Sequence, residues 1–351
     1  MPHLPSGVHA RWIDHHRASK DGITMLAGES EDASHCAKEG QGLSAKELRA
    51  DIVGVTLVCV FTILGPIAAF GWLALDFHGV AVFMTLYVIT QNLPNFFSMG
   101  VFESWLGAKP FTYLIDYVSP FRVVIEEELD PERTYVIGWH PHGRVFVGIG
   151  VLVGQLFNWL PQFKQASRMV HVAINDAMFR IPLIGNWLQL LGLVPVNKHS
   201  IKCVLRRGDS VCIVVGGIDE VLLGTHDDKD VLYLRKRVGF AKIALESGAG
   251  LVPVFCFGEN QLFLHSSEAS LGFWRRVNAF VKLGAPFPIQ GRWGLPIMFR
   301  RPLMVVWGRP LFAGEGESLL EFHARYIQAL EGLYERHVGQ TADPKRKLVV
   351  V

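Results

Sequence analysis

The sequence predicts an α/β domain preceded by an N-terminal transmembrane or re-entrant helical hairpin. Beyond residue 111, short apolar runs alternate with helical patterns and are separated by glycine and proline, which is typical of α/β proteins. Before that point, two long stretches contain no Asp, Glu, Lys or Arg. Hydrophobic residues make up 50% of the chain, which favours membrane association.

The two uncharged stretches are residues 52–75 and 79–102. A helix needs about 20 apolar residues to cross a bilayer, so residues 51–102 are predicted to form a membrane hairpin that spans the bilayer or re-enters one leaflet. Lys and Arg flank the hairpin but are absent from its turn, which indicates cytosolic termini. The alternative is a helix pair buried in a soluble core, although soluble helices of this length usually keep a solvated face.

The predicted organisation is a flexible cytosolic segment, the hairpin, one large domain and a mobile tail, at residues 1–50, 51–102, 103–340 and 341–351. A helix is expected at 238–247 with Gly248 as its C-cap, and an amphipathic helix from Leu319 to Tyr334. Apolar runs predict strands at 135–138, 169–174, 193–196, 211–215, 251–257 and 303–307.

Composition and motifs exclude several function classes. A formal net charge of +2 is too small to indicate a nucleic-acid partner. The 5 cysteines are widely separated and form no CxxC pair, so neither a disulfide framework nor a zinc site is indicated. The sequence contains no GxSxG, GxxxxGK[ST] or HExxH motif. We therefore expect neither a covalent mechanism nor a resident metal or cofactor.

The segment most indicative of chemistry is His140-Pro141-His142-Gly143, at the end of an apolar strand. Residues two apart in an extended chain share a face, so the two imidazoles are expected to point the same way. Histidine is suited to removing a proton from an alcohol near neutral pH. Backbone N–H groups of Gly143 and Arg144 are candidate donors to an oxyanion. The alternatives are a metal-ligand pair, which would need a third ligand, or a structural pair.

A second candidate segment follows the predicted strand 211–215. Gly216 and Gly217 form a turn that leads to Glu220. If the two strands are neighbours, the Glu220 carboxylate could orient or charge-balance an imidazole. The alternative is a carboxylate that only complements the dipole at the start of a helix.

A third candidate segment is the basic run Arg235-Lys236-Arg237, directly before the helix that Gly239-Phe240 opens. Three cations at a helix N-terminus oppose the helix dipole, so they are a poor choice for stability alone. An anionic ligand with phosphate groups would resolve this conflict. The alternative is a solvated surface cluster.

Four motifs in this order resemble those of the type 2 diacylglycerol acyltransferase family, which includes monoacylglycerol acyltransferases and some wax-ester synthases. The resemblance runs from the hairpin to about residue 312. Its motifs are His-Pro-His-Gly at 140–143, Val-Val-Gly-Gly-x-x-Glu at 214–220, the basic run with Gly-Phe-x-x-x-Ala at 239–244, and Leu-Val-Pro-Val-x-x-Phe-Gly-Glu-Asn at 251–260, which ends on Glu259 and Asn260.

The resemblance implies a glycerolipid-acyltransferase-like mixed sheet with flanking helices. It implies an enzyme of the endoplasmic reticulum membrane and lipid droplets that transfers an acyl group from acyl-CoA, a co-substrate, to diacylglycerol. Of the two imidazoles, we expect His142 to be the base with His140 in support, with the reverse assignment as the alternative. The phosphates of coenzyme A fit the run 235–237. The alternatives are a monoacylglycerol or long-chain alcohol acceptor, or a non-catalytic membrane lipid-binding protein. The oligomeric state is left open.

The sequence departs from the wider glycerolipid acyltransferases at one important position. In those enzymes an acid follows the catalytic histidine in a His-x4-Asp pattern, but here Val145 and Val147 fill that slot. The acidic partner must come from elsewhere or be absent, and Glu220 is the first candidate. Val238 also separates Arg237 from Gly239, where the family usually has a basic residue.

Overall fold

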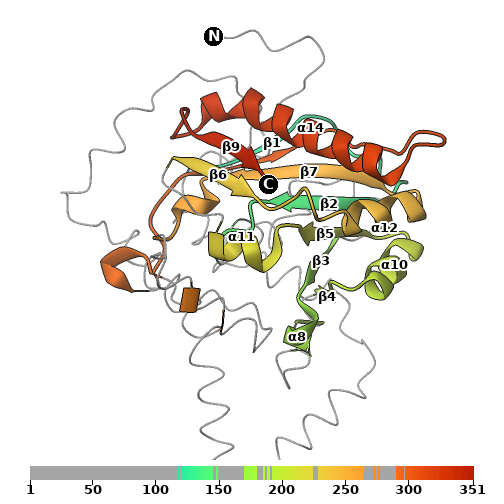
Figure 1. Cartoon of the computed structure of the whole chain (residues 1–351), viewed down its shortest axis with the longest axis horizontal. Helices are drawn as coiled ribbons and strands as arrows, with labels where there is room; N and C mark the ends of the chain where they lie inside the picture. Colours follow the sequence, from blue (N-terminus) through green and yellow to red (C-terminus); the bar gives the residue numbers. More distant parts are fainter. Residues whose placement is uncertain are drawn as a thin grey trace, which may run out of the picture.

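The chain folds around a seven-stranded mixed sheet with the strand order β1-β8-β7-β2-β5-β3-β4 (Figure 1). Its strands are β1 (Phe121–Ile125), β2 (Tyr135–His140), β3 (Val170–Ile174), β4 (Val194–Pro195), β5 (Ser210–Val214), β7 (Gly250–Phe257) and β8 (Leu303–Trp307). The computed structural model describes residues 118, 120–144, 148, 170–179, 185, 188, 189, 192–223, 228–264, 272, 273, 276, 290–295 and 297–351.

Strand β2 lies in the middle of the sheet, between β7 and β5, and runs parallel to both. All neighbouring strands are parallel except β7 and β8, which are antiparallel. Every residue of β2 and β7 is buried, as expected for central strands that are covered on both faces. The carboxyl ends of β7, β2 and β5 therefore meet at one edge of the sheet.

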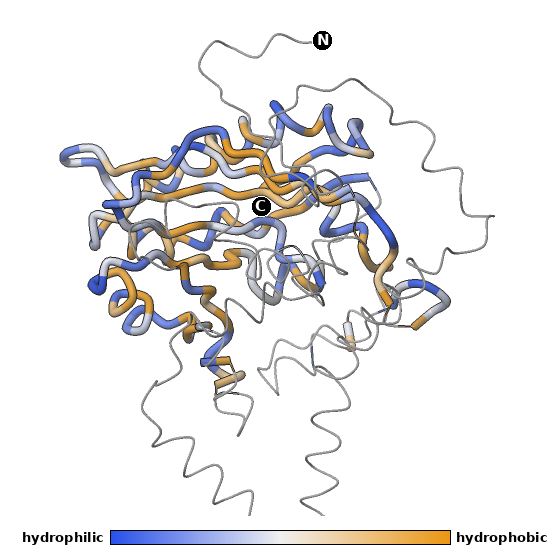
Figure 2. The backbone as a smooth tube through the Cα atoms, turned by 180° about the vertical axis from the view of Figure 1, so that it is seen from behind, coloured by the Kyte–Doolittle hydropathy of each residue, from blue (hydrophilic) through white to orange (hydrophobic). Residues whose placement is uncertain are grey.

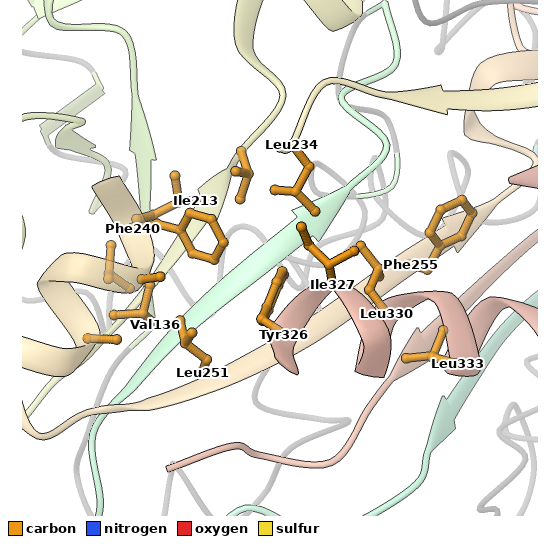
Figure 3. Close-up of a cluster of buried hydrophobic side chains, with 14 of the residues drawn as sticks. Val136, Ile213, Leu234, Phe240, Leu251, Phe255, Tyr326, Ile327, Leu330 and Leu333 are labelled. Carbon is orange, nitrogen blue, oxygen red and sulfur yellow. The ribbon is translucent and has the colours of Figure 1, made fainter. Parts of the chain in front are cut away.

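Three helices pack on one face of the sheet: α10 (Lys198–Arg206), α12 (Gly239–Ser247) and α14 (Leu319–His337). They contribute to one apolar cluster with Val136, Ile213 and Leu251 of the sheet (Figure 3). A capping box between Ser318 and Glu321 fixes the start of α14. The shorter helices are α8 (Asp176–Phe179), α11 (Gly217–Leu223), η3 (Glu259–Gln261), η4 (Arg292–Gly294) and η5 (Val338–Gln340).

The sheet divides the apolar core into two clusters. Alternate residues of β2 face opposite sides, so Val136 belongs to the helix-covered cluster while Ile137 and Trp139 belong to the other. Apolar segments occupy the middle of the molecule and hydrophilic ones its periphery (Figure 2). Because His140 lies two residues after Gly138 and four after Val136, its side chain faces the helix layer.

The predicted α/β class, with a mixed sheet and flanking helices, is confirmed. All six predicted strands are present, with bounds within two residues of those expected, and the helix expected at 238–247 is α12. Gly248 ends α12 in the left-handed conformation with φ of 66°. The structure adds β1 and a two-stranded sheet of β6 (Lys229–Leu232) and β9 (Lys347–Val350), which the sequence did not predict.

The segment 341–351 differs from the mobile tail that we expected. Residues 347–350 form β9 and pair in parallel with β6, with Lys229 opposite Lys347 and Leu232 opposite Val350. The buried Arg346 guanidinium, directly before β9, forms an ion pair with Asp230 at 3.0 Å. This partner lies more than 100 residues away, so the local sequence did not reveal it.

The N-terminal segment 1–50 and the predicted hairpin 51–102 lie outside the residues that the structure describes. No helix within the described ranges combines the length and apolar character that crossing a bilayer requires. The hairpin therefore stays a prediction from the sequence.

Candidate active site

Three segments with polar side chains meet at the carboxyl edge of the sheet. His140 ends β2 and residues 141–144 follow it, Glu220 lies on α11 directly after β5, and Glu259 follows β7. In α/β proteins, ligands bind outside the carboxyl ends of parallel strands. The peptide bond between His140 and Pro141 is cis, and Gly143 adopts a φ of 61° that favours glycine. Gly143 thus forms a turn directly after the end of β2.

His140 is fully buried beneath α14. Its Nε2 atom lies 3.0 Å from the hydroxyl of Tyr326, and this hydroxyl also donates to the carbonyl of Gly138 at 3.3 Å. Its Nδ1 atom has no hydrogen-bond partner within the described residues. Burial lowers the pKa of His140 to about 3, so the imidazole is neutral. His140 is therefore part of the core between sheet and helix.

The contact between β2 and α14 depends on Gly138. A Cβ atom at this position would lie 1.9 Å from the hydroxyl oxygen of Tyr326. Phe240 of α12 packs edge-on against the Tyr326 ring, with 4.9 Å between the ring centroids. Figure 3 shows both aromatic rings in the cluster next to β2. The motif residue Phe240 thus fixes the tyrosine that contacts His140.

His142 is more accessible than His140, with an intermediate exposure. Its Nδ1 atom lies 3.2 Å from the carbonyl oxygen of Gly143. A carbonyl only accepts, so we assign the proton to Nδ1, which places the imidazole lone pair on Nε2. Burial lowers the pKa of His142 to about 4, although the bond to the Gly143 carbonyl raises it in part. The ring is therefore neutral at physiological pH.

Glu220 is buried and contacts the histidine segment through the backbone. One carboxylate oxygen accepts a hydrogen bond from the backbone N–H of His142, and the other accepts from that of Tyr233 at 3.2 Å. The expected contact with an imidazole ring is replaced by this contact with the backbone. Gly216 leaves room for the carboxylate, because a Cβ atom there would lie 1.9 Å from Glu220 Oε2.

Burial raises the pKa of Glu220 to about 7, although its backbone hydrogen bonds act in the opposite direction. Because the pKa of Glu220 is higher in the folded than in the unfolded protein, folding favours the protonated carboxyl group. The stability that protonated Glu220 contributes is therefore fully present below about pH 4.5 and is lost as the pH rises through 7. We expect the unfolding free energy of the wild type, relative to Glu220→Gln, to fall by about 3 kcal/mol from pH 4.5 to 8. Chemical unfolding in detergent across this range tests this, and a constant difference would contradict it.

Glu259 lies buried beneath the turn after β2. Its Oε2 atom accepts from the backbone N–H of Gly148 at 2.8 Å and from the thiol of Cys256 at 3.5 Å. A Cβ atom at Gly143 would approach Glu259 Cγ to 2.6 Å. The carboxylate and the turn therefore fit closely only because residue 143 is glycine.

The neighbouring motif residue Asn260 bonds to Asp230 of β6. Its amide donates to Asp230 Oδ1 at 2.8 Å, and the Tyr334 hydroxyl donates to Asp230 Oδ2 at 3.0 Å. Together with Arg346, which directly precedes β9, these buried side chains connect η3, β6 and α14. Asn260 therefore has a structural role.

The basic run 235–237 is exposed, and its residues have different neighbours. Arg237 pairs with Asp219 on α11 at 2.8 Å, and a Cβ atom at Gly217 would lie 3.7 Å from the Arg237 guanidinium. Arg235 instead donates through Nε to the carbonyl of Val350 at 3.0 Å. Lys236 is exposed, and Gly239 is the first residue of α12. Arg237 is thus the member of the run that lies beside the Glu220 turn.

Reasoning from the sequence missed the role of Tyr326. Its position on the apolar face of α14 was expected, but its hydroxyl contact with His140 joins residues 186 positions apart. The only available signal was a tyrosine among the buried positions of an amphipathic helix, because a buried tyrosine hydroxyl usually has a hydrogen-bond partner.

At this edge of the sheet, His142 has a neutral and partly accessible imidazole, and the buried Glu220 carboxylate holds its backbone N–H. Such an imidazole can accept a proton from a hydroxyl group. No group of three His, Cys, Asp or Glu side chains suited to a metal ion occurs in the described part of the chain. Fold and site define an α/β protein with a histidine–carboxylate cluster at the carboxyl edge of its sheet.

The chain belongs to the diacylglycerol acyltransferase family, whose sequence model matches residues 77–351. It is 32% identical over 303 residues to human 2-acylglycerol O-acyltransferase 3, covering 80% of this chain and 87% of that protein. It is 30% identical over 276 residues to diacylglycerol O-acyltransferase 2 of Xenopus tropicalis, covering 73% and 75%. The resemblance stated from the four motifs is confirmed.

A solved structure also aligns with the chain. The crystal structure of the 1-acyl-sn-glycerophosphate (LPA) acyltransferase from Thermotoga maritima covers 83% of this chain and 97% of its own, with 15% sequence identity and a TM-score of 0.42.

Proposed function

We propose that the protein is an acyl-CoA-dependent O-acyltransferase that converts diacylglycerol to triacylglycerol, with His142 as the general base. One observation carries the proposal: a neutral, partly accessible imidazole at the carboxyl end of the central strand, in a segment positioned by Glu220. Family membership supports acyl transfer to an acylglycerol.

The proposed reaction begins with the acceptor hydroxyl next to His142. Nε2 accepts the hydroxyl proton while the oxygen attacks the thioester carbonyl carbon. The intermediate then collapses, the C–S bond breaks, and the protonated imidazole returns its proton to the departing sulfur. Glu220 acts as a positioning residue, since it holds the His142 backbone and not the ring.

A second candidate acceptor is 2-acylglycerol. Relatives named as 2-acylglycerol O-acyltransferases match the chain at 32–33% identity, against 30% for the diacylglycerol enzyme of Xenopus tropicalis. Both acceptors present a hydroxyl on a glycerol backbone, so the same base serves either. The two acceptors differ in their number of acyl chains, one in 2-acylglycerol and two in diacylglycerol. A long-chain alcohol would react in the same way.

The test uses microsomes that contain the full-length protein, supplied with labelled acyl-CoA and a panel of acceptors: diacylglycerol, 2-acylglycerol and a long-chain alcohol. We expect ester formation with diacylglycerol at the highest kcat/KM. Preference for 2-acylglycerol would replace the proposed acceptor. If the protein is folded in the membrane and forms no ester with any acceptor, it binds lipid without turnover and the enzymatic proposal is wrong.

The basic run gives a second expected result. Replacing Arg235, Lys236 and Arg237 with Gln should raise the KM for acyl-CoA about 10–100-fold and leave the acceptor KM unchanged. Arg237 is the member of the run beside the site, and losing one charged hydrogen bond to phosphate weakens binding by about 1.5–3 kcal/mol. Steady-state kinetics with each substrate varied in turn measures this.

A matched control replaces Arg206 and Arg207, which are exposed at the end of α10, the helix that precedes the amino end of β5. Their Gln variants should keep the wild-type KM for acyl-CoA. Equal increases in both KM values in the 235–237 variant would indicate general misfolding and would contradict a phosphate-binding role.

The proposed function also suggests where in the cell the protein is located. The acceptor is water-insoluble, so we infer that the predicted hairpin 51–102 holds the domain at the endoplasmic reticulum membrane and at lipid droplets, with both termini in the cytosol. Fractionation and protease protection of tagged termini test this, since a luminal terminus would contradict it.

A further inference from the structure

Arg144, the residue directly after the His-Pro-His-Gly segment, is buried with 3% exposure. Its Nε and Nη1 atoms have no hydrogen-bond partner within the described residues. No ion pair with a carboxylate of the described chain accompanies it, and burial alone lowers the pKa of the guanidinium. Among the described residues, Arg144 is thus a buried cation without an anionic partner.

Within the described residues, two buried carboxylates lie at this edge of the sheet, and both are engaged elsewhere. Glu220 accepts from the backbone N–H groups of His142 and Tyr233, and Glu259 accepts from that of Gly148 and from the Cys256 thiol. Buried charges in proteins are normally paired, because removing an unpaired ion from water is unfavourable. We therefore expect a bound ligand to supply the negative charge that pairs with Arg144.

The position of Arg144 restricts which ligand can supply the negative charge. Only Gly143 separates it from His142, the proposed base, so Arg144 belongs to the same turn as that base. A preorganised cation in a site of low dielectric stabilises charge that develops during a reaction more than it would in water. The exposed basic run 235–237 is available to bind the phosphates of the donor, so Arg144 is free to bind another group of the ligand.

We propose that the Arg144 guanidinium binds the carbonyl oxygen of the acyl donor and stabilises the negative charge on it in the tetrahedral intermediate. The inference rests on the proposed acyl transfer. As the acceptor oxygen bonds to the carbonyl carbon, the π electron pair moves to the carbonyl oxygen beside Arg144 and the proton moves to His142. When the C=O bond re-forms, the C–S bond breaks and the sulfur takes the proton. Arg144 is then a catalytic residue.

The experiment compares the full-length wild type, Arg144→Gln and Arg144→Lys with two donors, oleoyl-CoA and S-oleoyl pantetheine, which lacks all the phosphates. We expect Arg144→Gln to lower kcat about 10²–10³-fold with both donors. The donor KM should stay near its wild-type value, and Arg144→Lys should give an intermediate kcat. Arg207→Gln, a substitution at an exposed arginine on the same domain, should leave kcat unchanged.

Binding of a thioether analogue of oleoyl-CoA, which has no carbonyl oxygen, provides a readout independent of turnover. Unchanged analogue binding by Arg144→Gln, together with its lower kcat, supports the proposal. A higher donor KM that returns to the wild-type value with S-oleoyl pantetheine would assign Arg144 to a phosphate and overturn it. Loss of analogue binding and of thermal stability in both variants would assign it to packing and also overturn it.

Failure of the inference is distinct from failure of the proposed function. If the wild type forms ester and Arg144→Gln retains its kcat, acyl transfer stands and the role of Arg144 is wrong. If the wild type forms no ester with any acceptor, the proposed function is wrong, and the role of Arg144 is wrong with it.

Discussion

Substituting His142 with alanine is expected to lower kcat about 10²–10⁴-fold, the usual contribution of a general base, while thermal stability stays close to that of the wild type. The imidazole is only partly buried, and the bond that ties this segment to Glu220 comes from the backbone N–H, which alanine retains. Kinetics in microsomes and thermal unfolding in detergent measure the two effects.

His140 provides the comparison. It is fully buried and bonded to Tyr326, so His140→Ala should lower both thermal stability and activity. Tyr326→Phe removes only the hydroxyl and should cause a smaller loss of both. If His140→Ala is as stable as the wild type while His142→Ala is active, the two assignments must be exchanged.

The pH dependence of the reaction follows from the low pKa of His142. A base with a pKa of about 4 is almost wholly neutral above pH 5, so its deprotonation does not limit the rate at neutral pH. It is also a weak base, because the optimal pKa lies near the working pH. Stabilisation of the developing oxyanion, for which Arg144 is our candidate, is correspondingly more important.

Substituting Arg346 with methionine is expected to destabilise the domain by about 3–5 kcal/mol, the usual effect of removing one partner of a buried ion pair. Arg346 and Asp230 are each 6% exposed at the side chain, and the carboxylate also accepts from Asn260 and Tyr334. Methionine preserves the apolar stem but leaves the Asp230 charge without its cation. Denaturant unfolding monitored in detergent measures the change.

Two further variants test whether the effect comes from the unpaired carboxylate. Lys345→Met changes an exposed residue next to Arg346 and should leave stability within about 0.5 kcal/mol of the wild type. Adding Asp230→Asn to Arg346→Met should recover part of the loss, because the buried negative charge is removed. An additive loss in the double variant would contradict this explanation.

The central strands could be predicted from the sequence because they are long, apolar and buried on both faces. β7 is eight residues long and entirely buried, and β2 carries its apolar run up to His140. β6 and β9 have four residues each, and the burial of β9 alternates between exposed and intermediate. Such short segments are recognisable only from their partner strand, which is more than 100 residues away.

The candidate site could be predicted in outline but not in its contacts. A carboxylate after β5 was expected near the histidines, because the carboxyl ends of neighbouring parallel strands meet. Whether Glu220 contacts an imidazole ring or a backbone N–H depends on the tertiary geometry of the Gly216 turn, which no sequence pattern encodes. That Arg144 has no anionic partner in the described part of the chain is likewise visible only when its burial and its neighbours are known.

The pairing of β1 with β8 has a consequence for protein synthesis. Phe121 of β1 aligns with Leu303 of β8, about 180 residues later in the chain. At about 5–20 residues per second, β1 leaves the ribosome about 10–35 s before its neighbour exists. During this interval its apolar side chains and unpaired edge are open to aggregation. Completion of the sheet at this edge therefore waits until translation has passed β8.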